Sequence, residues 1–288
     1  MSRLVVAITG SQGYVGRHIA RAVVAAGYEV ISFDRHKPIA GDWQFYELSH
    51  SPDSRLLRGV DVVVHCAYDM SLTRASDIAR VNVGGTRQLV AAAANSGARF
   101  CFLSSMSAYA GTRQLYGRAK LASELDVLSQ QGQVVRLGLV YGLDEGGMIA
   151  ALARIAKLPV VPVIGRSCRQ FTVYAADMAS AIVRLIEHPV AASDAIGLAH
   201  PVSVRFDHIV GALAANRGSR PLVVPIPWTP VYAAMRIAEA MSLQLPIRAD
   251  SILGLVRPAS YVPNFDVWAR LGADIRPFDA TALPFIDA

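Results

Sequence analysis

The feature that most constrains this chain is a glycine-rich turn close to its start. The apolar segment Leu4–Ile8 predicts a buried strand, and it runs directly into Thr9-Gly10-Ser11-Gln12-Gly13-Tyr14-Val15-Gly16, where a helix is predicted over Tyr14–Ala26. Glycines at this spacing let the backbone curl tightly, approach a phosphate and pack helix against strand. Because the helix N-terminus then faces the anion, we predict a pyrophosphate site. Its residues are Gly10, Gln12, Gly13, Tyr14, Val15 and Gly16.

Asp34 ends the second predicted strand, about 20 residues beyond the glycine turn, the usual spacing for a ribose-binding acid. A carboxylate there accepts hydrogen bonds from the hydroxyls of an adenosine ribose, which favours NAD as cofactor. Arg35 and Lys37 follow at once and are able to hold a 2′-phosphate instead, so NADP stays open.

Strand and helix patterns alternate through the first half of the chain. The predicted strands are Leu4–Ile8, Glu29–Phe33, Trp43–Leu48, Asp61–His65, Arg99–Leu103 and Gln133–Leu139. The predicted helices between them are Tyr14–Ala26, a short one around Ser54–Arg58, one within Ala75–Asn95, and Tyr116–Leu128. This order predicts an α/β fold, a Rossmann-type doubly wound parallel sheet covered on both faces, with ligands at the carboxyl ends of its strands.

Beyond Gly142 the alternation loosens. Helices are predicted over Met148–Lys157, Ala175–Glu187, Val204–Ala215 and Pro230–Met241, and strands over Gln170–Val173 and Pro221–Ile226. We therefore expect an NAD(P)-binding Rossmann domain over residues 1–142, joined by about 170–190. A smaller, mixed C-terminal substrate-binding region is expected over 143–169 and 191–288.

Composition narrows the class of protein further. The hydrophobic residues, 53% of 288, are not gathered into a run of 18 or more, and the start lacks a signal-peptide pattern, so we expect no transmembrane segment and a cytoplasmic location. The net charge of +6 comes from dispersed arginines, which favours an anionic small molecule over nucleic acid. Cys66, Cys101 and Cys168 lack metal-ligand spacing, so we expect core cysteines and no metal site.

Tyr116 and Lys120 stand four residues apart on a predicted helix and therefore share one face. A lysine charge beside a phenol is expected to lower the phenol pKa, so that the tyrosine exchanges a proton with a carbonyl or an alcohol. The lysine also suits a nicotinamide ribose. The pair predicts a proton-transfer site.

Three segments carry a family resemblance: the glycine turn, Tyr116-Gly117-Arg118-Ala119-Lys120 and Phe102-Leu103-Ser104-Ser105-Met106-Ser107. Together they resemble the extended short-chain dehydrogenase/reductase superfamily, specifically its NAD-dependent epimerase/dehydratase branch, which acts on nucleotide sugars. The resemblance implies hydride transfer with Tyr116 as acid/base, tuned by Lys120. It implies that Ser105 orients the reacting oxygen, with Ser107 as the fallback, and that Ser104 lies beside the cofactor.

Softer correspondences follow the family's order along the chain. The resemblance implies further cofactor-binding positions at Glu47, Leu48, Cys66, Ala67, Tyr68, Asn82, Leu139 and Val140. On the substrate side, Arg169 in Arg169-Gln170-Phe171-Thr172-Val173 and Arg257 before Pro258 resemble the arginines that bind a nucleotide diphosphate, although Gln170 replaces the family's aspartate.

Two departures bear on the substrate. Ten residues separate Ser105 from Tyr116, a shorter loop than in the family's sugar epimerases, and the stretch Leu222–Leu255 is more apolar than a sugar pocket requires. That stretch suits a hydrophobic substrate site, an oligomer contact or a patch touching lipid.

We therefore expect a 4-ketoreductase or epimerase of a nucleotide-activated sugar, acting as a homodimer. One alternative is a reductase or dehydrogenase of a hydrophobic alcohol or ketone. Another is a catalytically silent dinucleotide-sensing regulator, against which the intact Tyr116 and Lys120 spacing counts.

Overall fold

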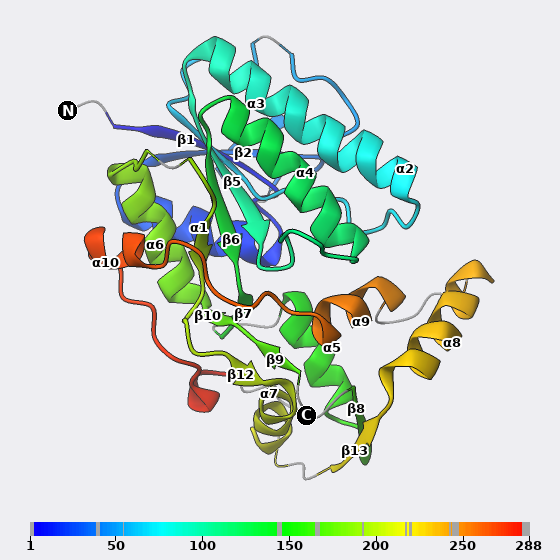
Figure 1. The fold of residues 1–288 in the computed structure, drawn as a ribbon. Coiled ribbons are helices and arrows are strands. Elements are labelled where there is room, and N and C mark those ends of the chain that lie inside the picture. The colour runs from blue at the N-terminus through cyan, green and yellow to red at the C-terminus, as the bar shows by residue number, and fades with distance from the viewer. Residues whose placement is uncertain are drawn as a thin grey trace.

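A seven-stranded parallel sheet is the centre of the protein (Figure 1), with strand order β11-β6-β5-β4-β1-β2-β3. The computed structural model describes residues 3–38, 41–53, 55–142, 146–164, 168–191, 193–216, 218, 221–241, 243 and 248–283. The strands are β1 (Val5–Thr9), β2 (Glu29–Asp34), β3 (Asp42–Phe45), β4 (Val62–His65), β5 (Arg99–Ser105), β6 (Gln133–Leu137) and β11 (Ile196–Leu198). The order confirms the predicted Rossmann-type, doubly wound α/β fold.

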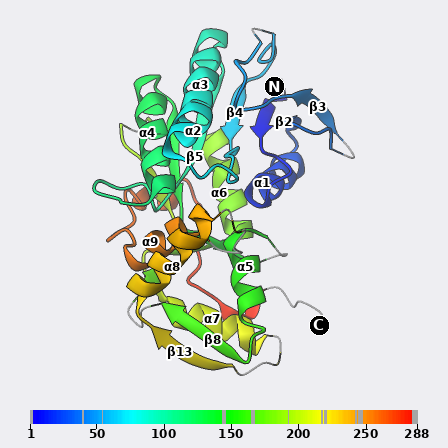
Figure 2. The same ribbon diagram turned by 90° about the vertical axis from the view of Figure 1, so that its right-hand side faces the viewer.

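Helices cover both faces of this sheet (Figure 2). One face carries α1 (Tyr14–Ala25) and α6 (Ala175–Glu187), and the other carries α3 (Gly84–Ser96) and α4 (Leu115–Ser129). The short α2 (Ala75–Ile78) and a π-helical turn, η1 (Ala79–Val83), lead into α3. Along β1, Val6 and Ile8 pack into the α1 and α6 core, whereas Ala7 packs into the α3 core. Strands buried on both faces explain the continuous apolar runs of the sequence.

Most of the remaining elements build a smaller part around a separate apolar core, in which α5 (Gly147–Ile155) packs against α7 (Phe206–Ala215), whereas Val267 and Trp268 of α10 (Asp266–Arg270) pack into the core of the main sheet. Three two-stranded sheets join it: β7 (Leu139–Tyr141) with β10 (Thr172–Tyr174), β9 (Arg169–Gln170) with β12 (Val204–Arg205), and β8 (Val160–Ile164) with β13 (Leu222–Ile226). The chain then forms α8 (Trp228–Ala240), α9 (Ala249–Val256), α10 (Asp266–Arg270) and a 3-10 turn, η2 (Ala280–Ala282). The expected domain boundaries stay a prediction.

Two predicted strands are divided in the structure. The strand predicted over Gln133–Leu139 ends at Leu137 because Gly138 lies tightly against Phe171, where an added Cβ would be 2.6 Å from the Phe171 carbonyl oxygen. The strand predicted over Gln170–Val173 is interrupted at the same contact, and its two halves pair with β12 and β7.

The prediction of a short helix around Ser54–Arg58 is wrong. Residues 55–59 form turns, in which the Asp53 carboxylate accepts a hydrogen bond from the Arg55 amide and Gly59 adopts a φ of +74° before β4 begins. Ser54 itself lies outside the described residues. Strands β8 and β11 and helix α9 were not predicted.

The cysteines have the expected role, since Cys101 and Cys168 are buried, Cys66 is partly buried and all three are free thiols. Within the described ranges, no helix combines the length and the hydropathy needed to cross a bilayer. Over the same ranges, no cluster of three or more histidine, cysteine, aspartate or glutamate side chains is placed to hold a metal ion.

The packing around Gly16 leaves no room for a side chain, which an alanine substitution tests. A Cβ there would lie 2.2 Å from the Gly10 carbonyl oxygen, so we expect Gly16→Ala to lower the free energy of unfolding by ~1–3 kcal/mol through overpacking. Gly211, within α7, is the matched control because nothing lies within 4 Å of its added Cβ. Gly211→Ala should instead raise stability by ~0.5–1 kcal/mol. Urea unfolding measures both, and equal effects would contradict the close approach of α1 to the glycine turn.

Candidate active site

A cavity of about 390 Å³ lies at the carboxyl ends of β1, β2 and β4. Gly10 and Gly13 form one wall, and an added Cβ at Gly10 would lie 3.0 Å from Ala67 and fill the cradle. Helix α1 begins beside it with Gly13 as its N-cap, without a side-chain cap and without an acid in its first turn. Amide groups and a helix dipole that no side chain neutralises suit an anion, so these residues fit the pyrophosphate of a dinucleotide.

The cavity brings together most of the predicted cofactor residues from four separate segments. They are Gly10, Gln12, Gly13, Asp34, Arg35, Glu47, Leu48, Cys66, Ala67 and Tyr68. The wall also includes Phe33, His36, Tyr46, Ser49, Asp69 and Val81, which were not predicted. Several of these residues are adjacent in sequence to predicted ones, so extending each motif by one or two residues would have identified them.

Asp34 joins the second strand to the glycine turn. The Ser11 hydroxyl donates to its carboxylate over 2.5 Å, and the Trp43 indole donates to its carbonyl oxygen over 3.1 Å. Burial raises the pKa of Asp34, while hydrogen bonds from Ser11 and Gln12 and the charge of Arg35 oppose this. A buried acid with Arg35 exposed at its side can face either a ribose hydroxyl or a ribose phosphate.

A buried histidine holds the loop that follows β4. Thr9 Oγ1 accepts hydrogen bonds from the amides of Cys66 and Ala67, both over 3.1 Å, so its own proton is directed to His65 Nδ1 at 2.7 Å. His65 Nε2 then donates to Thr86 Oγ1 over 3.0 Å. Burial, together with the charge of Lys120, lowers the pKa of His65 to about 3. The neutral ring therefore fixes the Cys66 and Ala67 wall of the cavity.

Asn82 braces the same loop from the π-helical turn. Its side-chain oxygen accepts from the Asp69 amide over 2.7 Å, and its side-chain nitrogen donates to the Asp69 carbonyl over 3.2 Å. Asn82 is buried, and it does not line the cavity. Its side chain therefore supports cofactor-binding residues through the loop, which fits the tendency of π-bulges to occur near functional sites.

Other predicted cofactor residues also lie outside the cavity lining. The Ser104 hydroxyl donates over 2.5 Å to Glu124, which Arg136 contacts at 2.9 and 2.6 Å. The Tyr14 hydroxyl donates to the Gly142 carbonyl over 2.7 Å. Val15, Leu139 and Val140 are partly buried and pack against the two apolar cores, and Gly16 serves the helix–strand contact.

The predicted proton-transfer residues meet where α4 crosses the end of β5. Lys120 is buried and donates over 2.7 Å to the Leu103 carbonyl, and its Nζ lies 6.0 Å from the centre of the Tyr116 ring. The Tyr68 ring stands edge-on to Tyr116 with a centroid distance of 4.9 Å. Tyr68 also lines the cavity, so it joins the cavity wall to Tyr116, although Ser105, Tyr116 and Lys120 are not themselves among the lining residues.

Ser105 presents its hydroxyl to this tyrosine. Ser105 Oγ accepts from the Ser107 amide over 3.1 Å, and its hydroxyl is hydrogen-bonded to Tyr116. Burial raises the pKa of Tyr116 to about 12, which the Ser105 hydrogen bond opposes, and burial lowers the pKa of Lys120 to about 8. The predicted lowering of the phenol pKa is thus reversed by desolvation, and Tyr116 is a proton donor at neutral pH.

The N-terminus of α4, the helix that bears Tyr116, is capped from the far end of the chain. The Asp250 carboxylate, at the start of α9, accepts from the amides of Leu115 and Tyr116 over 2.7 and 3.1 Å. Beside it, Arg248 donates to the Met70 and Leu72 carbonyls over 3.3 and 3.0 Å. Neither contact was predicted, because partners more than 130 residues apart leave no local pattern.

The predicted substrate arginines lie at the edge of this region. Arg169 donates from Nε to the Ser203 hydroxyl over 2.8 Å and from Nη2 to the Ser203 carbonyl. The Arg257 carbonyl accepts from the Tyr109 hydroxyl over 2.7 Å, and Arg257 is exposed. The guanidinium of Arg169 is therefore hydrogen-bonded to a neighbouring loop, whereas Arg257 is anchored by a hydrogen bond to its backbone carbonyl.

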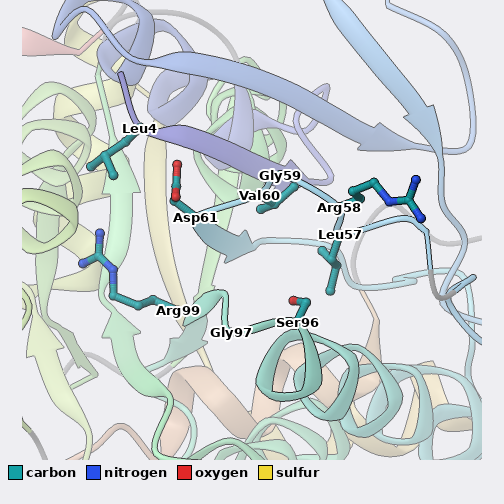
Figure 3. Close-up of a pocket in the computed structure, with 9 residues that line it drawn as sticks. All are labelled: Leu4, Leu57, Arg58, Gly59, Val60, Asp61, Ser96, Gly97 and Arg99. Atoms are coloured by element: carbon teal, nitrogen blue, oxygen red, sulfur yellow. The ribbon is translucent and has the colours of Figure 1, made fainter. Parts of the chain in front are cut away.

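A second, larger pocket of about 730 Å³ lies at the opposite ends of the sheet strands (Figure 3). Leu4, Asp61 and Arg99 line it, at the amino-terminal ends of β1, β4 and β5. Ligands of open parallel sheets bind at the carboxyl ends of the strands, and the Ser105, Tyr116 and Lys120 group is also at that edge. The smaller cavity is therefore the candidate active site.

Comparison with known proteins agrees with this geometry. The model of the NAD dependent epimerase/dehydratase family matches residues 6–197. The ceramide reductase of Caulobacter vibrioides is 28% identical over 256 residues, which cover 84% of this chain and 79% of that protein. The dTDP-6-deoxy-L-talose 4-dehydrogenase (NAD(P)(+)) of Kitasatospora kifunensis is 28% identical over 57% of this chain and 61% of its own.

Among solved structures, MoeE5 in complex with UDP-glucose and NAD superposes with a TM-score of 0.73 at 20% identity, over 96% of this chain and 95% of that chain. At this identity the likeness shows the fold alone. The family match extends from the first strand through the glycine turn and the Tyr116 helix to β11. The chain therefore belongs to the NAD dependent epimerase/dehydratase family, whose members are NAD(P)-dependent enzymes of the extended short-chain dehydrogenase/reductase superfamily.

Proposed function

We propose that this protein is an NAD(P)-dependent reductase that converts a ketone on a long-chain, lipid-like substrate into an alcohol. The observation that carries the choice of substrate is the Asp250 contact. It sets α9 against the start of the helix that bears Tyr116, and on α9 the apolar Leu253 and Leu255 are only partly buried. A hydrophobic chain next to the reacting carbonyl is the occupant that such a wall favours.

Two further observations support this substrate class. Arg169, which the family resemblance assigns to a nucleotide diphosphate, is hydrogen-bonded to Ser203. The Caulobacter relative, similar over most of both chains, is a ceramide reductase, and ceramide is a lipid with long alkyl chains. The alternative reductase of a hydrophobic ketone thus becomes the leading proposal.

The chemistry follows from the protonation states of the three side chains. When bound in the glycine-turn cavity, a reduced dinucleotide would provide the hydride that the carbonyl carbon receives. Tyr116, protonated at neutral pH, donates its proton to the oxygen as the C=O π bond opens, which leaves an alcohol and a phenolate. The Ser105 hydroxyl donates a hydrogen bond to the same oxygen, and the Lys120 ammonium stabilises the phenolate until water reprotonates it.

The glycine turn and the cavity walls hold the dinucleotide in this proposal. Gly10 and Gly13 receive the pyrophosphate, and Asp34 accepts from the adenosine ribose hydroxyls. Arg35, exposed beside Asp34, contacts a 2′-phosphate when the cofactor is NADP. A homodimer and a cytoplasmic location stay predictions.

The second candidate is the expected 4-ketoreductase or epimerase of a nucleotide-activated sugar. The Kitasatospora relative, a 4-dehydrogenase of a dTDP-sugar, favours it. So does the exposed Arg257, whose backbone is tied by Tyr109 to the loop after Ser105. The same tyrosine, lysine and serine serve either substrate, which makes substrate preference the decisive measurement.

A substrate panel tests the proposal. Purified protein with NADH or NADPH should reduce a long-chain amido ketone in detergent micelles and show little turnover of a UDP-4-keto-sugar, measured by loss of reduced-nicotinamide absorbance. Tyr116→Phe should lower kcat by ~10²–10⁴-fold because it removes the proton donor, while cofactor affinity stays unchanged. Preferred turnover of the nucleotide sugar would replace the proposal with the second candidate.

The pH dependence of reduction follows from the two shifted groups. Tyr116, with its pKa raised to about 12, stays protonated, whereas Lys120 loses its charge as the pH rises through about 8. We expect kcat/KM for ketone reduction to be level near neutrality and to fall above pH 8. The Lys120→Met variant should have a low kcat/KM that does not fall further above pH 8. A wild-type rate that is flat to pH 10 would contradict the role of the ammonium.

Asp250 should act as a positioning residue for Tyr116. Asp250→Ala removes the acceptor of two helix amides, so we expect kcat to fall by roughly 10-fold or more while the dissociation constant of the cofactor is unchanged. Asp250→Asn retains one oxygen acceptor and should recover part of kcat. Asp266→Ala on α10, an exposed acid in another first helical turn, is the control. A kcat unchanged in Asp250→Ala would show that the cap is dispensable.

A further inference from the structure

Helix α8 presents a row of apolar side chains to solvent. None of its residues is buried, and the exposed positions recur at helical spacing along one face. That face consists of Pro230, Ala233, Ala234, Ile237, Ala240 and the following Met241. Ile237 and Met241 are 62% and 68% exposed. Thr229 and Arg236 are exposed beside them, whereas the bulkier Trp228, Val231, Tyr232 and Met235 lie on the opposite side of the helix and are partly buried. Among the described residues, Ile237 and Met241 are therefore the large apolar side chains that α8 leaves at the surface.

The β8–β13 strand pair, which precedes α8, also exposes apolar side chains. In the parallel β8–β13 register, Val160 pairs with Leu222 and Pro162 with Val224, so these side chains share one face. Val160 and Leu222 are 48% and 66% exposed, whereas Val161 on the other face is buried. Pro227 alone separates β13 from α8, so the two exposed apolar surfaces follow each other in the chain. The ribbons of β8, β13 and α8 lie at the periphery of the smaller part of the molecule (Figures 1 and 2).

The charges around these faces indicate which partner covers them. Arg154 and Lys157 are exposed just before β8, and Arg236 is exposed on α8. Across residues 146–164 and 221–241 the sole acid is Glu239, whose carboxylate accepts from the Ala249 amide and lies 3.7 Å from Arg236. A second copy of the same surface would bring like charges together, whereas anionic headgroups would neutralise them.

We propose that α8 and the β8–β13 pair, the apolar lobe, dock on the surface of an anionic lipid bilayer. The exposed apolar side chains of α8, Ile237 and Met241 above all, enter the headgroup boundary. The inference rests on the proposed lipid-like substrate: α8 contacts α9 through Glu239, and α9 contacts Tyr116 through Asp250. Docking thus places the active site next to the membrane that holds its substrate.

Vesicle sedimentation tests the proposal without any substrate. The full chain should co-sediment with vesicles of equal parts phosphatidylglycerol and phosphatidylcholine, and less with phosphatidylcholine alone or at high salt. Ile237→Glu/Met241→Glu should weaken this binding on the order of tenfold or more, since two apolar side chains leave the interface. Val24→Glu, which alters an exposed valine of α1, is the matched control and should bind as the wild type does.

Reduction of a short-chain, water-soluble amido ketone separates the two proposals. The double variant should keep this activity, so a loss of vesicle binding with retained turnover supports the docking surface. Absence of vesicle binding by the wild type, equal binding by the double variant, or a dimer that the double substitution dissociates would each overturn it. Failure of the proposed function instead shows as no turnover of either ketone, whatever the vesicle result.

Discussion

The catalytic geometry depends on one buried charge. Lys120 lies within the protein between α4 and β5, where its ammonium is held by the Leu103 carbonyl and by the faces of the Phe102 and Tyr68 rings, at 4.5 and 5.2 Å from their centres. An ammonium so far from water tolerates few positions, because each alternative loses a charge-assisted contact. The helix that carries Lys120 is therefore fixed on the strand that ends in Ser105, and Tyr116 is fixed with it.

Buried polar contacts extend this constraint to the rest of the site. The Thr9, His65 and Thr86 chain holds the loop after β4, and Glu124, clamped by Ser104 and Arg136, joins α4 to β5 and β6. Each group of this kind is costly to bury unless its partners are in place, so a correctly paired set specifies a single arrangement. The cavity walls consequently have a defined shape before any ligand enters.

The sequence indicated the sheet and most of the cavity because their signals are local. The glycine spacing, Asp34 at a strand end, and the four-residue step from Tyr116 to Lys120 each lie within one element or one turn. The roles of Asn82 and Ser104 were harder to infer, since each side chain bonds to a segment more than ten residues away. The pKa of Tyr116 was predicted in the wrong direction because burial is a property of the packed structure.

The chain by itself determined the family and the candidate site residues, since strand–turn–helix geometry and helical periodicity depend on neighbouring residues alone. Only the tertiary structure decided what surrounds them. Asp250 reaches Tyr116, and a row of apolar side chains of α8 remains at the surface, because elements distant in sequence take their places through packing and charge. Those long-range contacts have no sequence period, so only the folded chain shows them.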